Sequence, residues 1–251
     1  MAGQTGVITL KGTIGSISFY KSRDGHMARE KGGVDGARIA TDPAFQRTRE
    51  NGAEFGRAGR GSKVLRNALR VIIQNAKDRR VVSRLTTKML EVLQGDTTSI
   101  RGERTVTGGD LASLQGFEFN ANAPLGTTLY APFTTTIDRS AGTCVVNLPA
   151  FVPANLVAAP SGATHFKIVS AVAEVDFANE TFVSDSKESQ ILPWDPTLTT
   201  AINLSHTMTN AGTQPAFILL GIQFYQAVNT VNYPLKNGAF NSLQLVKVDV
   251  V

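Results

Sequence analysis

The chain has 251 residues and a formal net charge of +5 at pH 7, long enough for one large domain or two modest ones with a real hydrophobic core. Its single cysteine, Cys144, excludes an internal disulfide framework and a zinc site built from cysteines, and reads as a small buried residue on a strand. No apolar run is long enough to span a bilayer, so membrane insertion is not expected.

Positive charge is concentrated at one end of the chain. Residues 1–104 contain twenty Lys and Arg against ten Asp and Glu, whereas residues 105–251 contain five against ten. A basic first part joined to an acidic second part favours polyanion binding or head-to-tail contact between copies. The first twelve residues lack the pattern of a secretory signal, so we expect a cytoplasmic location or a particle assembled in the cytoplasm.

Residues 1–40 are predicted to form an N-terminal β-ribbon or arm. Val7–Leu10 is one candidate strand, and Ile17–Lys21 should pair with Met27–Arg29 around the turn Asp24-Gly25. A ribbon of this size is marginal in water by itself. We therefore expect it to lie against its own C-terminal part or against a neighbouring subunit.

A basic helical region is predicted over residues 41–104, after a Gly-rich stretch, 32–41, that is expected to be a loop. Asp42 is a good N-cap residue, and Pro43 suits the first helical position. The acidic cap and the proline together predict a helix that starts here.

Four glycines within ten residues complicate this helix. Each costs about 1 kcal/mol relative to alanine in a helix interior, so we expect a break near Gly59–Gly61 or close backbone packing through Gly52 and Gly56. Ser62–Asp78 reads as a cleaner helix, and a further one is expected over Asp78–Gln94, closing at Gly95. The apolar face predicted for the first of these is Leu65, Ala68, Leu69, Ile72, Ile73 and Ala76.

Residues 105–251 are predicted to be an antiparallel β-sandwich, which makes the chain an α+β protein. Short strands with Pro and Gly between them are typical of this fold. The expected strands are Gly116–Asn120, Thr127–Asp138, Thr143–Phe151, His165–Asp176, Thr181–Ser186, Thr200–Thr207, Ala216–Val228 and Leu243–Val251. Hairpin turns are expected at 138–142 and 176–180.

No motif of catalysis or cofactor binding is recognisable. Gly56–Lys63 approaches a phosphate-binding loop, but lysine and serine stand in the reverse order and the segment reads as helix. His26, His165 and His206 share no metal-ligand spacing. We therefore expect a non-enzymatic protein with no cofactor, no metal and no small-molecule substrate.

The basic helices hold the candidate functional residues. Arginine dominates there, and it pairs with phosphate or carboxylate in a bidentate way. Three interpretations stay open: phosphate contact, pairing with the acidic part of an adjacent copy, or a merely solvated face. The residues expected to contact a partner or phosphate are Arg47, Arg49, Arg57, Arg60, Lys63, Arg66, Arg70, Arg79, Arg80 and Arg84.

The run Gly12-Thr13-Ile14-Gly15 and the Arg-rich segment after it resemble uncharacterised proteins from Bacteroidota genomes. Those proteins open with a Gly-Thr-Ile-Gly ribbon and an Arg-rich helix, followed by a β-rich remainder. The resemblance covers residues 11–33, 41–70, 165–183 and 233–246. It implies a bacterial source and the same order of parts, and it brings no activity, substrate or catalytic residue with it.

Two functions are predicted ahead of the others. The first is a structural subunit that self-assembles into a homo-oligomer, such as a tube, filament or phage-like particle, through its N-terminal arm and basic helices. The second is sequence-independent nucleic-acid binding through the Arg-rich helices. A sandwich that binds carbohydrate or protein through its loops is a third alternative.

Overall fold

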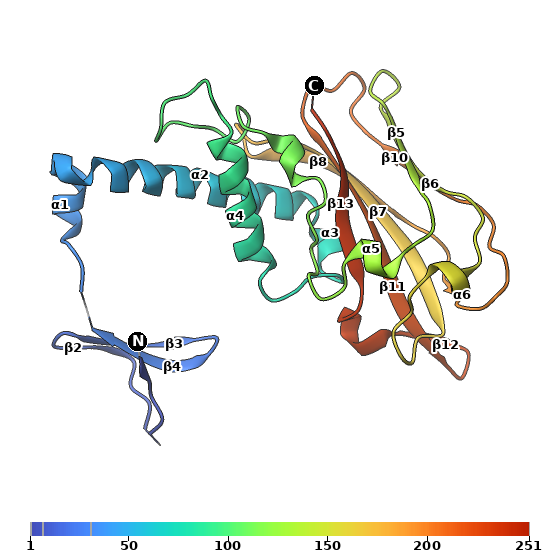
Figure 1. Cartoon of the computed structure of the whole chain (residues 1–251), viewed down its shortest axis with the longest axis horizontal. Helices are drawn as coiled ribbons and strands as arrows, with labels where there is room; N and C mark the ends of the chain where they lie inside the picture. Colours follow the sequence, from blue (N-terminus) through green and yellow to red (C-terminus); the bar gives the residue numbers. More distant parts are fainter. Residues whose placement is uncertain (1, 7, 31, 251) are drawn as a thin grey trace. The chain divides into compact units, whose positions relative to one another are not determined.

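The structure is a computed structural model that describes residues 2–6, 8–30 and 32–250 (Figure 1). Two compact units divide the chain, Met1–Glu50 and Asn51–Val251. Helices and antiparallel sheets are combined in one chain, as the predicted α+β class requires. Among the described residues, no helix combines the length and the apolar character that crossing a membrane would need.

The first unit contains a four-stranded antiparallel sheet in the order β1-β4-β3-β2. Its strands are β1 (Ala2–Gly3), β2 (Gly12–Ile14), β3 (Ile17–Ser22) and β4 (Gly25–Glu30). The predicted hairpin is confirmed, with Ile17 opposite Glu30 and Ser22 opposite Gly25. The strand predicted at Val7–Leu10 is wrong for Ile8–Leu10, which lie outside any strand, and Val7 lies outside the described residues.

A short helix occupies part of the segment 32–41 that the sequence predicts as a loop. α1 (Gly36–Thr41) forms because the Asp35 carboxylate accepts a hydrogen bond from the amide of Ala37 and caps its first turn. Asp42 then caps the 3₁₀ helix η1 (Pro43–Phe45) by accepting from the amide of Ala44 at 2.9 Å. The cap predicted at Asp42 is confirmed, and Asp35, within the Gly-rich stretch, is a second cap that was not predicted from the sequence.

The long helix α2 (Gln46–Ala68) continues through all four glycines, so the predicted break near Gly59–Gly61 is wrong. The close packing predicted as the alternative occurs at a different glycine. A Cβ on Gly61 would lie 3.1 Å from Val106 and 3.3 Å from Met89, whereas a Cβ on Gly52 would meet nothing within 4 Å. Tertiary contact at Gly61 offsets the low helix propensity of the segment.

Two more helices follow, α3 (Arg70–Ile73) and α4 (Val81–Gln94). Leu69 separates α2 from α3 because its backbone leaves the helical region, at φ −103° and ψ 15°. The end of α4 at Gly95 is confirmed. All six residues of the predicted apolar face are buried: Leu65, Ala68, Leu69, Ile72, Ile73 and Ala76.

A six-stranded antiparallel sheet forms the centre of the second unit, with the order β12-β11-β7-β8 and with β13 and β9 paired to β11 and β7. Its strands are β7 (His165–Asp176), β8 (Thr181–Glu188), β9 (Leu192–Pro193), β11 (Ala216–Val228), β12 (Val231–Pro234) and β13 (Ser242–Asp249). The bounds predicted for β7 and β11 are confirmed. Ten residue pairs, from Ala216 opposite Glu174 to Tyr225 opposite His165, join these two strands.

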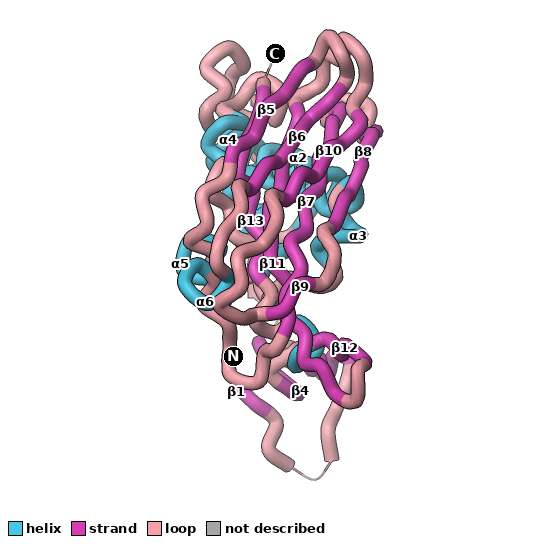
Figure 2. Tube along the Cα trace, turned by 90° about the vertical axis from the view of Figure 1, so that its right-hand side faces the viewer, coloured by secondary structure: helices cyan, strands magenta, loops and turns pink. Residues whose placement is uncertain are grey.

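A separate three-stranded sheet has the order β10-β6-β5. It consists of β5 (Thr134–Asp138), β6 (Thr143–Leu148) and β10 (Ile202–Thr207). In Figure 2 this sheet lies in front of the central sheet, and helices α2 and α4 lie behind the central sheet. The second unit therefore has three layers: helices, central sheet and smaller sheet.

Side chains alternate along β7 between two hydrophobic cores. Odd-numbered residues such as Val169 and Val175 pack with the helices, and even-numbered ones such as Ile168 and Val172 pack with the smaller sheet. The core on the helix side of β7 thus contains residues from both predicted regions, the helical one from Ala58 onward and the β-rich one. Because both faces of the strand are buried, its central stretch from Ile168 to Val175 is apolar apart from Ser170 and Glu174.

Several expected strand bounds are corrected by the structure. Gly116–Asn120 forms only a bridge from Glu118 to Gln244, and the segment predicted as strand from Thr127 becomes strand only at Thr134. Backbone hydrogen bonds to β13 or local turns replace the ladder in these places. The short helices that connect the strands are η2 (Leu111–Leu114), α5 (Leu125–Thr128), α6 (Pro153–Leu156) and η3 (Leu235–Gly238).

The glycines of α2 give a direct test of this packing. We expect Gly59→Ala to raise the free energy of unfolding by about 0.5–1 kcal/mol, because an added methyl meets no atom within 4 Å and alanine favours helix. Gly61→Leu should lower it by roughly 1–3 kcal/mol through overpacking against Met89 and Val106. Urea unfolding measures both. Equal destabilisation by the two substitutions would contradict this account.

Candidate polyanion and partner interface

Four of the predicted arginines are held by contacts within their own unit. Arg47 pairs with Glu50, and Arg49 donates to the carbonyl oxygens of Ile39 and Asp42. In the second unit, Arg57 donates to the carbonyl of Gly102 at 2.6 Å. These side chains stabilise loops and helix ends of the chain itself.

Arg84 is the most constrained of the four. It pairs with the carboxylate of Asp78, donates to the carbonyl oxygen of Glu118 at 2.7 Å, and lies 5.0 Å from the ring centre of Phe117. Asp78 also accepts from the amides of Arg80 and Ala121. Although burial opposes it, these hydrogen bonds hold the pKa of Asp78 below its ordinary value.

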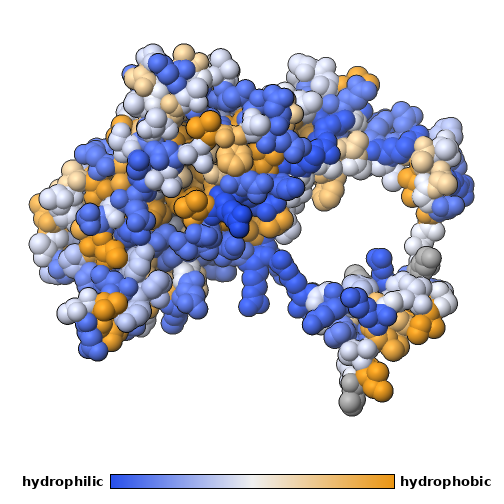
Figure 3. Space-filling view, turned by 180° about the vertical axis from the view of Figure 1, so that it is seen from behind, coloured by the Kyte–Doolittle hydropathy of each residue, from blue (hydrophilic) through white to orange (hydrophobic). Residues whose placement is uncertain are grey.

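The other predicted cations lie at the surface. Arg60 is 60% exposed and reaches Glu180 at 3.7 Å, and Arg66 is half-buried. In the space-filling view, hydrophilic side chains shown in blue gather over the part of the molecule that contains the helices (Figure 3). The exposed members are Lys63, Arg70, Arg79 and Arg80, and together with the exposed Lys77 we call them the cationic strip.

Two grooves of the second unit have volumes of about 390 and 550 Å³. The larger one is lined by members of the cationic strip. This basic groove, of about 550 Å³, is lined by Lys77, Arg79, Arg80 and Arg84 together with a single carboxylate, that of Asp78. Side-chain amides from Asn120 and Asn122 complete the polar wall. Because Arg84 pairs with Asp78, the positive charge that suits a phosphate group comes from Lys77, Arg79 and Arg80.

The asparagines of the basic groove were not predicted as site residues. Both lie in the turn after the Glu118 bridge, and only tertiary structure brings this turn beside the α3–α4 connection. Asn120 is buried and donates to the carbonyl oxygens of Ala239 and Asn241, so it also fixes the groove floor. Among the described lining residues no side chain is aromatic, so stacking on bases has no platform here.

A second polar cluster lies between the two sheets. His206 Nε2 is 3.0 Å from Ser170 Oγ, and His206 Nδ1 is 3.8 Å from Asp185 Oδ2. The order of groups is that of a hydrolase triad. However, Ser170 and His206 are 0% and 1% exposed, and the serine hydroxyl donates to the carbonyl oxygen of Leu219. The cluster therefore holds β7 against β10 and presents no nucleophile to solvent.

The remaining candidate groups are separated in space or buried. His26 lies on β4 in the first unit, and His165 Nδ1 contacts the hydroxyl of Thr164. Within the described ranges no three His, Cys, Asp or Glu residues gather as metal ligands would. Cys144 is buried on β6, as predicted, and burial raises the pKa of its thiol to about 11. Gly56–Lys63 is helical throughout, so it does not form a phosphate-binding loop.

Comparison with known proteins gives no relative: no family model, no curated protein and no solved structure matches the chain.

The neutral state of His206 predicts a pH dependence of stability. Burial lowers the pKa of His206 from its ordinary value of 6.5, although the neighbouring Asp185 opposes this and Lys187 adds to it. The unfolded chain therefore binds this proton more readily than the folded chain. The free energy of unfolding should fall as the pH drops below about 6.5, by at most about 1.4 kcal/mol per pH unit from this group.

Urea unfolding between pH 7.5 and 5.5 measures this slope. His206→Gln keeps a donor toward Ser170 Oγ and cannot be protonated, so we expect a flatter profile than in the wild type. His165→Gln is the matched control, because His165 is only half-buried, at the first position of β7. Identical slopes for wild type and His206→Gln would contradict the assignment.

Proposed function

We propose that the chain is a non-enzymatic structural subunit that assembles with copies of itself, through its N-terminal arm and basic helices, into a tube, filament or phage-like particle. Assembly in the cytoplasm, without a small-molecule substrate, belongs to this proposal. The three-stranded and central sheets would form the β-sandwich body of the subunit. The observation that carries the proposal is that the N-terminal unit forms a sheet without burying any of its described side chains.

None of the described residues up to Glu50 is buried, although this unit forms a four-stranded sheet. Ile14 is 63% exposed and Ile17 is 43% exposed, and the two are paired across β2 and β3. Ile8 is 82% exposed. A sheet without a covered face is marginal in water, so these side chains favour a partner surface that covers them.

Four apolar side chains form a patch on one face of this sheet. The register places Ile14 beside Ile17 and Phe19 beside Ala28, so all four project to the same side, which also carries Lys21, His26 and Glu30. A hollow of about 520 Å³ on this unit is lined in part by Ile17 and Ala28. The opposite face carries Tyr20 and Met27 together with Thr13 and Ser18, whose hydroxyl groups are 3.3 Å apart. Both faces therefore mix apolar and polar side chains, and the exposed pair Ile14 and Ile17 makes the first face the better candidate for docking against a partner.

Substitution of the apolar face tests the proposal. The wild-type chain should sediment as an oligomer after nuclease treatment, and Ile14→Asp should weaken its self-association about tenfold or more, because burying a carboxylate in an apolar contact is costly. Thr13→Asp is the matched control on the opposite face and should leave association nearly unchanged. Analytical ultracentrifugation with negative-stain microscopy measures both.

A wild-type chain that stays a compact monomer at high concentration and low salt would overturn the proposal. Loss of association in both variants alike would instead mean that the arm responds to charge and not to covering of its apolar face. Unfolding of the second unit, followed by circular dichroism, should be unchanged in either variant.

The basic groove favours nucleic-acid binding as a second candidate function. Its exposed cations Lys77, Arg79 and Arg80 would neutralise phosphates without reading bases, so affinity should fall steeply with salt. We expect the double substitution Lys77→Glu and Arg80→Glu to weaken binding of a single-stranded oligonucleotide at least tenfold and to reduce the salt slope by about 2. Lys187→Glu, a cation on β8, is the control. Binding that is absent at low salt, or equal in all variants, would exclude this function.

A further inference from the structure

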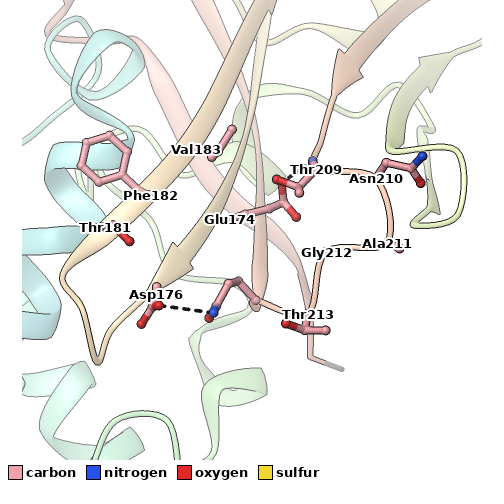
Figure 4. Close-up of a pocket in the computed structure, with 11 residues that line it drawn as sticks. Glu174, Asp176, Thr181, Phe182, Val183, Thr209, Asn210, Ala211, Gly212 and Thr213 are labelled. Atoms are coloured by element: carbon pink, nitrogen blue, oxygen red, sulfur yellow. Dashed lines mark hydrogen bonds between the residues drawn. The ribbon is translucent and has the colours of Figure 1, made fainter.

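A second groove, of about 390 Å³, opens where β7 ends, β8 begins and the loop 209–214 passes over them (Figure 4). Its charged groups are the carboxylates of Glu174 and Asp176, and no Lys, Arg or His is among its described lining residues. We call it the acidic groove. Neither carboxylate forms an ion pair with any residue for which the structure gives a position.

Glu174 has an unsatisfied oxygen in this groove. The residue is only 3% exposed, its Oε2 accepts from the amide of Thr209 at 2.6 Å, and its buried Oε1 has no hydrogen-bond partner. A Cβ on Gly212 would lie 2.5 Å from this Oε1, so the loop can approach it only with glycine at that position. A buried carboxylate oxygen without a partner is costly and calls for a donor.

Asp176 supplies a second negative charge. Its Oδ1 accepts from the amides of Ala178 and Asn179, and its Oδ2 accepts from the side chains of Asn179 and Gln214. These hydrogen bonds, that from the Asn179 amide above all, hold the pKa of Asp176 below its ordinary value, so the group is ionised near neutral pH. The two carboxylates project from the same face of β7, two residues apart.

An apolar surface borders the carboxylates. Val183 lies directly opposite Glu174 in the β7–β8 ladder and is 55% exposed. Thr181 lies opposite Asp176 in the same way. A ligand with an aliphatic stem and a cationic head would cover Val183 and reach both carboxylates.

The loop wall of the acidic groove is held in place by Arg139. Its Nη1 donates at 2.8 Å to the carbonyl oxygens of Gly212 and of Gln214, and its Nε pairs with Asp249 at 2.7 Å. This guanidinium is therefore occupied, and it fixes the wall without neutralising Glu174. Arg139 thus holds the wall of the groove in place, and no cation among the described lining residues neutralises its two carboxylates.

We infer that the acidic groove receives an arginine side chain from the cationic strip of a second copy of this chain. The inference rests on the proposed self-assembly and names one contact within it. Residues 1–104 carry a surplus of cations and residues 105–251 a surplus of anions, so a contact between unlike ends of two copies is electrostatically complementary. Such a contact is heterologous and propagates into rings or filaments.

Arginine fits the acidic groove better than lysine does. Its planar guanidinium presents several donors at once and can reach two acceptor groups, whereas an ammonium is a compact, strongly hydrated charge. Three of the five members of the cationic strip are arginines: Arg70, Arg79 and Arg80.

The groove itself is tested with N-acetylarginine amide as probe, and with N-acetylcitrulline amide as its neutral counterpart. Amide signals of Thr209 and Gly212 should shift in the wild type with the arginine probe and at least tenfold less with citrulline. Glu174→Gln should abolish the difference, because glutamine can still accept from the Thr209 amide and carries no charge. No shift in the wild type, or equal shifts with both probes, would overturn the cation site.

The partner is tested by self-association of the full chain. Glu174→Gln should weaken it about tenfold, whereas Glu188→Gln, which removes an exposed carboxylate of β8 that pairs with Lys167, should change it less than twofold. Association of the Glu174→Gln chain with wild-type affinity would overturn the partner assignment and leave self-assembly intact. A wild-type chain that binds the arginine probe but stays monomeric would overturn self-assembly and leave the cation site intact.

Discussion

Burial of both faces of one strand pair is the constraint on which the second unit depends. β7 and β11 are joined over ten residue pairs, and each gives one set of side chains to the helices and the other to the smaller sheet. A shift of one residue would exchange the two sets and leave both cores mismatched. The two polar residues in the buried centre of β7 each contact a neighbour: Ser170 contacts His206, and Glu174 accepts from the amide of Thr209.

The N-terminal unit shows the opposite balance. It has regular strand pairing and capped helix ends, yet none of its described residues is buried. Backbone hydrogen bonds alone add little net stability, because water competes for the same groups. This lack of buried residues within the N-terminal unit is what supports the proposed assembly with another copy.

Charge is divided between internal and external use. Arg57, Arg84 and Arg139 each donate to backbone carbonyl oxygens and fix loops, while the cationic strip faces solvent. The basic groove has a surplus of cations, with Asp78 as the one carboxylate among its lining residues, and the lining of the acidic groove carries two carboxylates and no cation. Unlike grooves on one chain provide the complementary surfaces that a heterologous contact requires.

The sequence by itself determined the elements whose local pattern is strong. Apolar-rich stretches between turn signals indicated the bounds of β7 and β11, the period of the helix indicated the buried face from Leu65 to Ala76, and Asp42 indicated a helix start. The excess of arginine in the helical region also follows from the sequence alone, because it is a matter of composition.

Only the tertiary structure decided the rest, because it depends on contacts between segments far apart in the chain. Packing of Gly61 against Met89 and Val106 keeps α2 continuous where local propensity predicts a break. The same holds for the grooves, since Asn120 meets the α3–α4 connection and Thr209 meets Glu174 only after folding. The same tertiary contacts decide which arginines form hydrogen bonds within the chain and which face solvent. The spacing of arginines in the sequence does not predict this division.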